Sequence, residues 1–272
     1  MTRRPWPVLK LGGELLETPE RLAEAAAAIA RAPGPFVIVH GGGREIDAAL
    51  ARAGIVKRQV DGLRVTDAET LGIVVDVLAG GVNTRFVAAL VTAGVRAVGL
   101  TGADAGAVRV DRAAPLRTTA GTTVDLGFVG EPRTDGDAAV LDALCLAGYV
   151  PVVASLGLGF DGAIYNVNAD TMAAHVAGSV GASRLVIAGG TPGVLDAEGR
   201  TIPEIDAATR RALLGNGVAT AGMIAKLRAC GQALESGVGE VLLMDGREGG
   251  ALAWALDRDA PAPAASFTRV VQ

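Results

Sequence analysis

Glycine-flanked lysine is the first combination in this sequence that could do chemistry. Lys10 lies inside the apolar segment 7–12, and Gly12 and Gly13 follow it. A buried ammonium group needs an anionic partner, and glycines let a backbone approach an anion without a Cβ in the way. The pattern therefore predicts a site for a phosphate or a carboxylate. A lysine on an edge strand that reaches solvent would explain the same residues equally well.

Three successive glycines, Gly41 to Gly43, follow the apolar segment 35–40 and open a predicted helix. Their backbone N–H groups, together with the helix N-terminus, form a cradle for an anion. The segment matches neither the dinucleotide motif Gly-x-Gly-x-x-Gly nor a Gly-Lys-Ser/Thr phosphate loop, and a flexible connection is the alternative. His40 is expected to be structural, because its turn position suits a backbone hydrogen bond.

Arg64 and Asn166 are candidates for binding a carboxylate. Arg64 precedes a helix capped by Thr66 or Asp67, and a guanidinium can grip a carboxylate with two parallel hydrogen bonds. On its own, Arg64 would be read as a solvated surface residue. Asn166 can donate to a ligand carboxylate, whereas Asn168 is fully explained as a helix N-cap.

Asp170 and Lys226 lie close to predicted helix starts. An acid in the first turn of a helix is favoured in any case, so a functional role for Asp170 depends on a lysine partner. Lys226 is expected in the first turn of a helix over residues 223–235, which is the unfavourable end for a cation. A bound anion would offset that cost, and an exposed helical lysine is the common alternative.

The elements that must position these residues alternate along the chain. Short apolar segments predict strands at 7–12, 35–40, 96–100, 150–155, 184–188, 240–244 and 266–271. Longer patterns predict helices at 19–32, 43–53, 68–93, 137–147, 168–180 and 223–235. This alternation is typical of an α/β fold with a mostly parallel sheet and helices on both faces. Segments 107–113 and 122–131 predict a hairpin outside that sheet, and Gly80–Gly81 predicts a break in the third helix.

Composition excludes several classes. The chain has 272 residues, half of them apolar, and a net charge of -4, so no basic excess indicates nucleic acid. Cys145 and Cys230 are far apart, which indicates buried reduced thiols rather than a disulfide framework or a metal site. No signal peptide is evident, and Asp76 and Arg85 interrupt the long apolar stretch. We expect a cytoplasmic protein without a membrane span.

Taken in order, the motifs KLGGELL, VIVHGGG, DGLRVTD, VDLGFVGE, AGYVPVVASLG, YNVNAD and GMIAK resemble the amino acid kinase family. They extend from Lys10 to Lys226. DGLRVTD and NVNAD are similar to the branch that phosphorylates N-acetyl-L-glutamate for arginine biosynthesis. The resemblance implies a three-layer αβα sandwich of two lobes. Residues 1–181 would bind the acid and form a dimer, and residues 182–272 would bind ATP.

The resemblance also implies a role for each motif. The catalytic residues would be the charged groups Lys10, Lys226 and Asp170, with Asp170 holding both lysines. Backbone N–H groups would bind phosphate and substrate at Gly12, Gly13, Gly42 and Gly43. Arg64 and Asn166 would bind the carboxylate that does not react. The cosubstrate would be ATP with Mg²⁺, and no residue is predicted to be a metal ligand.

The implied reaction suits these residue types. A carboxylate acceptor with a pKa near 4.3 is already ionised at pH 7, so it needs no general base. The barrier is the approach of one anion to another, which lysines and backbone N–H groups lower. The product, an acyl phosphate, reacts with water, so lobe closure should help.

Two departures from the family pattern bear on function. Gly190 stands in segment 188–193, where the family often has an acid, and this puts nucleotide-side details in question. Only nine residues precede Lys10, which favours a homodimer insensitive to arginine over a ring hexamer. Two alternatives remain: a kinase for another N-blocked acid, such as carrier-linked aminoadipate or glutamate, and a non-catalytic ligand-binding regulator with the same fold.

Overall fold

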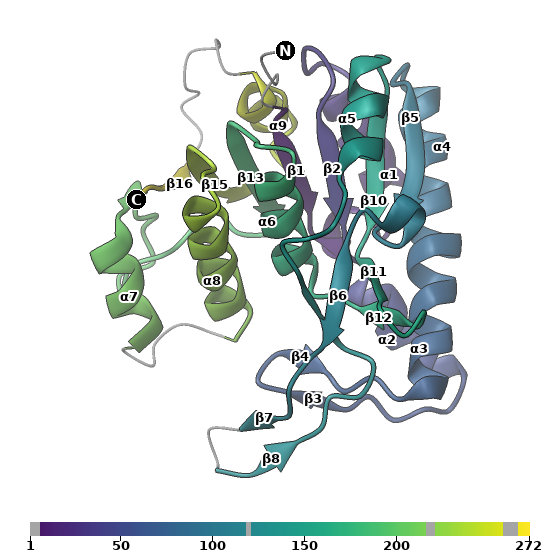
Figure 1. The fold of residues 1–272 in the computed structure, drawn as a ribbon. Coiled ribbons are helices and arrows are strands. Elements are labelled where there is room, and N and C mark those ends of the chain that lie inside the picture. Colours follow the sequence, from purple (N-terminus) through teal and green to yellow (C-terminus); the bar gives the residue numbers. More distant parts are fainter. Residues whose placement is uncertain (1–5, 118–120, 216–220, 258–265) are drawn as a thin grey trace.

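The computed structural model describes residues 6–117, 121–215, 221–257 and 266–272. The centre of the molecule is an eight-stranded sheet in the order β14-β16-β15-β13-β1-β2-β10-β5 (Figure 1). Neighbouring strands are parallel except β15 and β16. The strands are β1 Val8–Leu11, β2 Val37–His40, β5 Ala97–Thr101, β10 Val150–Ala154, β13 Arg184–Gly189, β14 Glu204–Ile205, β15 Glu240–Asp245 and β16 Phe267–Val270.

Helices cover both faces of this sheet. Apolar residues of α1, α4 and α9 form one core with the sheet, and those of α5, α6 and α8 form the other. The helices are α1 Pro19–Ile29, α2 Gly43–Arg52, α3 Ala68–Val75, α4 Thr84–Thr92, α5 Ala139–Leu146, α6 Ala169–Ser179, α7 Ala207–Gly215, α8 Ala221–Glu235 and α9 Gly249–Leu256. The predicted three-layer αβα sandwich with a mostly parallel sheet is confirmed.

Alternation along β1 decides where Lys10 points. Leu9 and Leu11 belong to the core beneath α1, α4 and α9, whereas Val8 belongs to the core beneath α5, α6 and α8. Successive side chains of a strand point to opposite faces, so Lys10 shares a face with Val8. The lysine of the central strand therefore faces α6, the helix that carries Asp170.

A second, four-stranded sheet lies beside the main one, in the order β12-β11-β6-β9. The predicted hairpin is part of it, because β6 Arg109–Arg112 and β9 Gly130–Pro132 pair antiparallel. Two strands that the sequence did not predict, β11 Leu156–Gly159 and β12 Ile164–Asn166, complete it. The small hairpins β3 Gln59–Val60 with β4 Leu63–Arg64, and β7 Leu116–Arg117 with β8 Thr123–Val124, project beyond the sheets (Figure 1).

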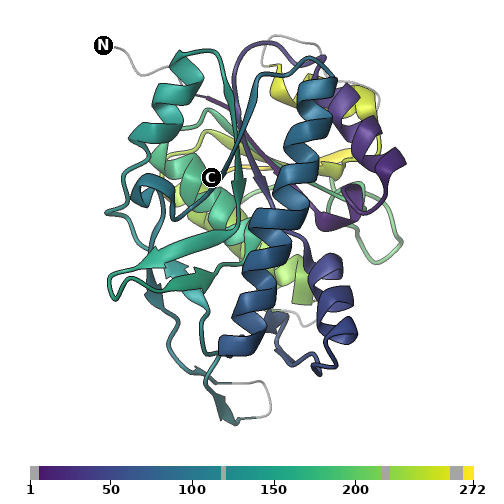
Figure 2. The same ribbon diagram turned by 90° about the vertical axis from the view of Figure 1, so that its right-hand side faces the viewer.

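The predicted break at Gly80–Gly81 is wrong. Between α3 and α4 the chain forms a π-helical segment, η2, from Asp76 to Asn83, and Figure 2 shows the whole stretch as one continuous helix. Glycine costs a helix only about 1 kcal/mol per residue. Burial of Leu78 and Val82 in the core outweighs that cost.

The same stretch, Ala68–Thr92, is the one helix among the described residues that is long and apolar enough to be tested as a membrane span, with a mean hydropathy of 1.6. Phe86 and Leu90 are fully buried against the sheet. The stretch also carries Asp76 and Arg85. This helix therefore contributes apolar side chains to the core of the protein.

The main sheet continues across the predicted lobe boundary at residues 181 and 182. Gly181, with φ of 61°, lies in the turn that joins α6 to β13. On the far side of that turn, β13 pairs with β1 in the register Leu9↔Val186 and Lys10↔Ile187. The two halves of the chain therefore contribute to a single ladder of strands.

Candidate active site

Asp170 joins the two lysines that the sequence singled out. Its Oδ1 lies 2.7 Å from Lys10 Nζ, and its Oδ2 lies 3.4 Å from Lys226 Nζ. The side chains of Lys10 and Asp170 are each 7% exposed, and that of Lys226 is 24% exposed. One carboxylate thus pairs with two ammonium groups that are 216 positions apart in the sequence, and the cluster keeps a net positive charge.

The start of α6 places the Asp170 carboxylate. Asn168 caps the helix as predicted, since its Oδ1 accepts hydrogen bonds from the backbone N–H groups of Asp170 (2.9 Å) and Thr171 (3.1 Å). Burial by itself would raise the pKa of Asp170, but the charges of Lys10 and Lys226 outweigh burial and hold that pKa below its ordinary value. Asp170 is therefore a carboxylate at neutral pH.

The predicted position of Lys226 within its helix is wrong. We expected the first turn of a helix beginning at residue 223, but α8 begins at Ala221, so Lys226 lies in its second turn. Lys226 is therefore not at the positive end of the helix, and no bound anion is needed to offset an unfavourable helix dipole. α8 packs along α6, and that packing brings Lys226 to Asp170.

Two glycine segments meet beside this charge cluster. A Cβ on Gly13 would lie 3.2 Å from Gly42 Cα and 3.3 Å from the Gly43 nitrogen, so the loop after β1 contacts the loop after β2 backbone to backbone. A Cβ on Gly42 would also come within 3.0 Å of Leu78. Gly42 is the N-cap of α2, so the free N–H groups of that helix end open here. Side chains at these positions would fill the cradle.

A buried polar network fixes the second glycine loop. His40 is completely buried, its Nδ1 lies 3.0 Å from the carbonyl oxygen of Gly41, and its Nε2 lies 3.0 Å from Asn83 Nδ2. The amide of Asn83 is a donor, so Nε2 accepts and Nδ1 donates its proton to Gly41. Asn83 also donates to the carbonyl of Val152 at 2.9 Å. The structural role expected of His40 is confirmed.

Neither histidine is placed to act as a base. Burial lowers the pKa of His40 to about 4, and both of its ring nitrogens are engaged. Burial also lowers the pKa of His175, whose Nε2 lies 3.4 Å from Ser179 Oγ on α6. Both side chains are neutral at pH 7, but His175 lines a different cavity from the one that holds Lys10 and Asp170, and His40 has no free ring nitrogen.

Arg64 is held in place with one donor group left over. Its Nη2 donates to Asp47 Oδ1 at 2.5 Å and to the carbonyl of Gly43 at 3.2 Å. Its Nη1 is buried and has no hydrogen-bond partner among the residues that the structure describes. Asp47 also accepts from Lys57 at 2.8 Å, and the two cations together keep the pKa of Asp47 below its ordinary value despite burial, which acts to raise it.

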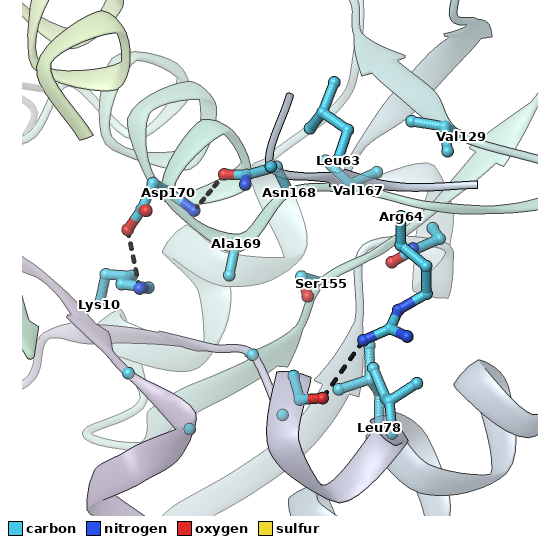
Figure 3. Close-up of a pocket in the computed structure, with 18 of the residues that line it drawn as sticks. Lys10, Leu63, Arg64, Leu78, Val129, Ser155, Val167, Asn168, Ala169 and Asp170 are labelled. Carbon is cyan, nitrogen blue, oxygen red and sulfur yellow. Dashed lines mark hydrogen bonds and ion pairs between the residues drawn. The ribbon is translucent and has the colours of Figure 1, made fainter. Parts of the chain in front are cut away.

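The Lys10–Asp170 pair, the two glycine segments and Arg64 line one cavity of about 240 Å³. In Figure 3, the Lys10–Asp170 pair and Arg64 lie on opposite sides of it, with Ala169 and Ser155 between them. Asn166 also lines it and donates to Thr66 at 3.2 Å. All the predicted site residues except Lys226 contribute to this cavity: Lys10, Gly12, Gly13, Gly42, Gly43, Arg64, Asn166 and Asp170.

A second cavity, of about 430 Å³, is the one that Lys226 lines. Among the described residues, the charged side chains that line it are four basic ones and one acid: Arg21, Arg44, Lys226, Arg247 and Glu14. Gly190, which stands where the family resemblance leads us to expect an acid, also lines it. Glu14 lines both cavities.

Sequence reasoning missed three polar residues around these cavities. Glu14 directly follows the glycine pair of KLGGELL, and that position could have marked it. Asp47 and Asn83 carry no comparable local signal. Their roles are to hold Arg64 and His40. These partners are distant in the sequence, so only the fold reveals the contacts.

Comparisons with known proteins agree with this geometry. The Amino acid kinase family matches residues 5–245. An acetylglutamate kinase of Granulibacter bethesdensis is 44% identical over 252 residues, which cover 89% of this chain and 83% of that protein. One of Chloroflexus aurantiacus is 44% identical over 239 residues, which cover 88% of this chain and 91% of that protein.

A solved structure leads to the same family. N-acetylglutamate synthase from Neisseria gonorrhoeae, complexed with coenzyme A and N-acetyl-glutamate, has a TM-score of 0.81 and 26% identity, over 98% of this chain and 59% of that one. The family match covers well over half of the chain, and the relatives exceed 40% identity over most of their length. This chain belongs to the amino acid kinase family.

Proposed function

We propose that this chain is an acetylglutamate kinase, which transfers the terminal phosphoryl group of ATP to the side-chain carboxylate of N-acetyl-L-glutamate. The observation that carries the proposal is the joining of Lys10 and Lys226 by Asp170 at one end of a cavity that has Arg64 at the other. The names of the 44% identical relatives support the same substrate and a place in arginine biosynthesis.

The cavity suits a short diacid with a blocked amine. Arg64 has a buried nitrogen free to donate to a carboxylate, and Asn166 lines the same cavity. An acid bound at that end would extend its second carboxylate toward Lys10. Leu63, Val129 and other apolar side chains line the walls between, where methylene and acetyl groups would be accommodated.

The phosphoryl step follows from the charges. A side-chain carboxylate oxygen attacks the terminal phosphorus of ATP, the bond from that phosphorus to the bridging oxygen breaks, and ADP leaves. Lys10 and Lys226 stand on the two sides of Asp170, so they would offset the charge of the transferring group and of the leaving phosphate. The backbone N–H groups of Gly13, Gly42 and Gly43 would donate to phosphate oxygens.

Magnesium would arrive with ATP. Among the described residues, no cluster of three or more His, Cys, Asp or Glu is placed to hold a metal ion. Mg²⁺ commonly binds through substrate phosphates and one or two carboxylates, and the two carboxylates that line the cavity are Glu14 and Asp170. Asp170 is engaged by both lysines, so Glu14 is the carboxylate that fits. When bound, Mg²⁺ would neutralise charge on the phosphates.

The arrangement of the chain in its assembly is also a proposal. Residues 1–181 would bind the acid and residues 182–272 the nucleotide, in a cytoplasmic homodimer. The edge strand β5 pairs on one side only in the main sheet, and α4, which packs on it, exposes Val91. Replacing Val91 by Glu should shift the protein from dimer to monomer in light scattering. A monomeric wild-type chain would contradict the dimer.

A hydroxamate assay with a panel of acids tests the proposed reaction, since acyl phosphates react with hydroxylamine. ATP-dependent product with N-acetyl-L-glutamate, and little with glutamate or aspartate, is the expected result. Product only with a carrier-linked aminoadipate or glutamate would move the assignment to that substrate. The absence of product with every acid would overturn the assignment as a kinase.

A further inference from the structure

Glu14 lines both cavities, so its carboxylate can act on a bound nucleotide beyond the single magnesium contact proposed above. It lies on the short 3₁₀ turn Gly13–Leu15 directly after the glycine pair. Its Oε1 accepts a hydrogen bond from the backbone N–H of Gly190 at 2.9 Å, across 176 positions of sequence. The loop after β1 and the loop after β13 are therefore connected through one carboxylate.

Glycines leave the room that this carboxylate fills. A Cβ on Gly12 would collide with the Glu14 carboxylate, and one on Gly189 would lie 3.2 Å from Oε1. Gly190 carries no side chain at the point where the family resemblance leads us to expect an acid. The Glu14 carboxylate lies within 3.7 Å of the position that a Cβ at Gly190 would take. A negative charge is thus present beside Gly190, although the turn after β1 supplies it.

The carboxylate also lies on the path of the nucleotide. Glu14 is the only acid among the described side chains that line the second cavity, whose other charged residues are basic. Lys226 Cε and Glu14 Oε1 both lie within 4.0 Å of the position of a Cβ on Gly189. Glu14 lines both cavities, so a phosphate chain that reaches from the second cavity to the Asp170 cluster would lie near its carboxylate.

A fixed carboxylate beside a phosphate chain acts differently on the two forms of a nucleotide. It repels a metal-free polyphosphate, whereas it attracts the magnesium ion that a complexed one carries. Since the site proposed above binds nucleotide here, we infer that Glu14 makes the cavity select the magnesium complex over the metal-free nucleotide. This inference rests on the proposed function and assigns Glu14 as its specificity-determining residue.

Nucleotide binding tests this without turnover. The dissociation constant of ADP is measured by calorimetry in Mg²⁺ and in EDTA at matched ionic strength, and the ratio of the EDTA value to the Mg²⁺ value is compared between variants. Glu14→Gln keeps an oxygen that can accept from Gly190 but removes the charge. Its ratio should fall by about ten-fold or more, since a unit charge about 4 Å from phosphate has an effect above that size at the effective dielectric of about 20 that is typical near a protein surface.

Two variants keep the result interpretable. Glu14→Asp keeps the charge and should keep a ratio close to that of the wild type. Glu24→Gln, the same substitution at an exposed position of α1 outside both cavities, should leave the ratio unchanged. A ratio for Glu14→Gln within about two-fold of the wild type would overturn the inference. Equal weakening of ADP binding in Mg²⁺ and in EDTA would also overturn it, because Glu14 would then only support the structure of the loop. A wild-type protein that binds no ADP at all would instead overturn the proposed function.

Discussion

Replacing Asp170 by Asn tests the charge cluster directly. The substitution keeps the shape of the side chain but removes the charge that balances Lys10 at 2.7 Å and Lys226 at 3.4 Å. Lys10 is 7% exposed and has little access to solvent that could replace its partner. Removing one partner of a buried ion pair typically costs 3–5 kcal/mol, so we expect a loss of about 3 kcal/mol in the free energy of unfolding. The partial exposure of Lys226 favours the lower end of that range.

The free energy of unfolding is measured by urea denaturation of the wild type and of three variants, Asp170→Asn, Lys10→Met and the double variant. The double variant should lose less than the sum of the single losses, because once one partner of the Lys10–Asp170 pair is uncharged, the other no longer has that interaction to lose. Asp125→Asn is the matched control. It removes an exposed carboxylate 2.8 Å from Arg112 and should change stability little.

The contribution of Asp170 to the free energy of unfolding should depend on pH with a definite sign. Because the pKa of Asp170 is lowered in the folded protein, its stabilising contribution is complete above the unfolded value near 3.9 and is lost as the pH falls through the folded value. The gap between wild type and Asp170→Asn should therefore be constant around neutral pH and should close in acid. A loss below about 1 kcal/mol at pH 7, or additive losses in the double variant, would refute the view that Asp170 holds both lysines.

Three further outcomes are expected. Lys10→Ala should lower kcat by about 10²-fold or more while changing the affinity for ATP far less, as measured by steady-state kinetics and calorimetry; equal losses in both would contradict a role in the transfer step. Arg64→Ala should raise KM for the acid by about ten-fold or more with a smaller effect on kcat, and an unchanged KM would exclude the carboxylate clamp. Asn83→Ala should cost about 1–3 kcal/mol in urea denaturation, because it leaves the buried Nε2 of His40 without a donor; a neutral result would mean that the His40–Asn83 network does not stabilise the glycine loop.

Most of the sheet and its helices could be predicted because their signals are local. Apolar segments bounded by glycine and proline predicted the strands of the main sheet, except β14, to within a few residues. Asn168 predicted the start of α6 correctly, since a cap acts on N–H groups only two or three residues away. The second sheet was harder. β11 and β12 are short strands that gain their stability from pairing with distant segments.

The site was predictable only as a set of separate motifs. Lys10, Asp170 and Lys226 each had an ordinary structural explanation, and it was the family resemblance that implied their meeting. Their placement depends on which face of β1 the lysine takes and on how α8 packs along α6, and both are decided by long-range packing. Glu14 carried no visible partner in the sequence, because Gly190 offers a backbone group and no side chain that could have indicated the pair.

The continuous pairing of strands on the two sides of residues 181 and 182 limits the conformational changes that the protein can make. Two bodies tied by a flexible tether swing about one or two bonds, but β1 and β13 remain aligned over four residue pairs. Any motion that brings the bound acid and the bound nucleotide closer together must therefore be spread as a change of twist over many strands. Such a motion is small at each residue, and its stiffness is set by the core of the protein rather than by a loop. Substitutions deep under the sheet, far from any ligand, should for that reason alter the rate at which product escapes.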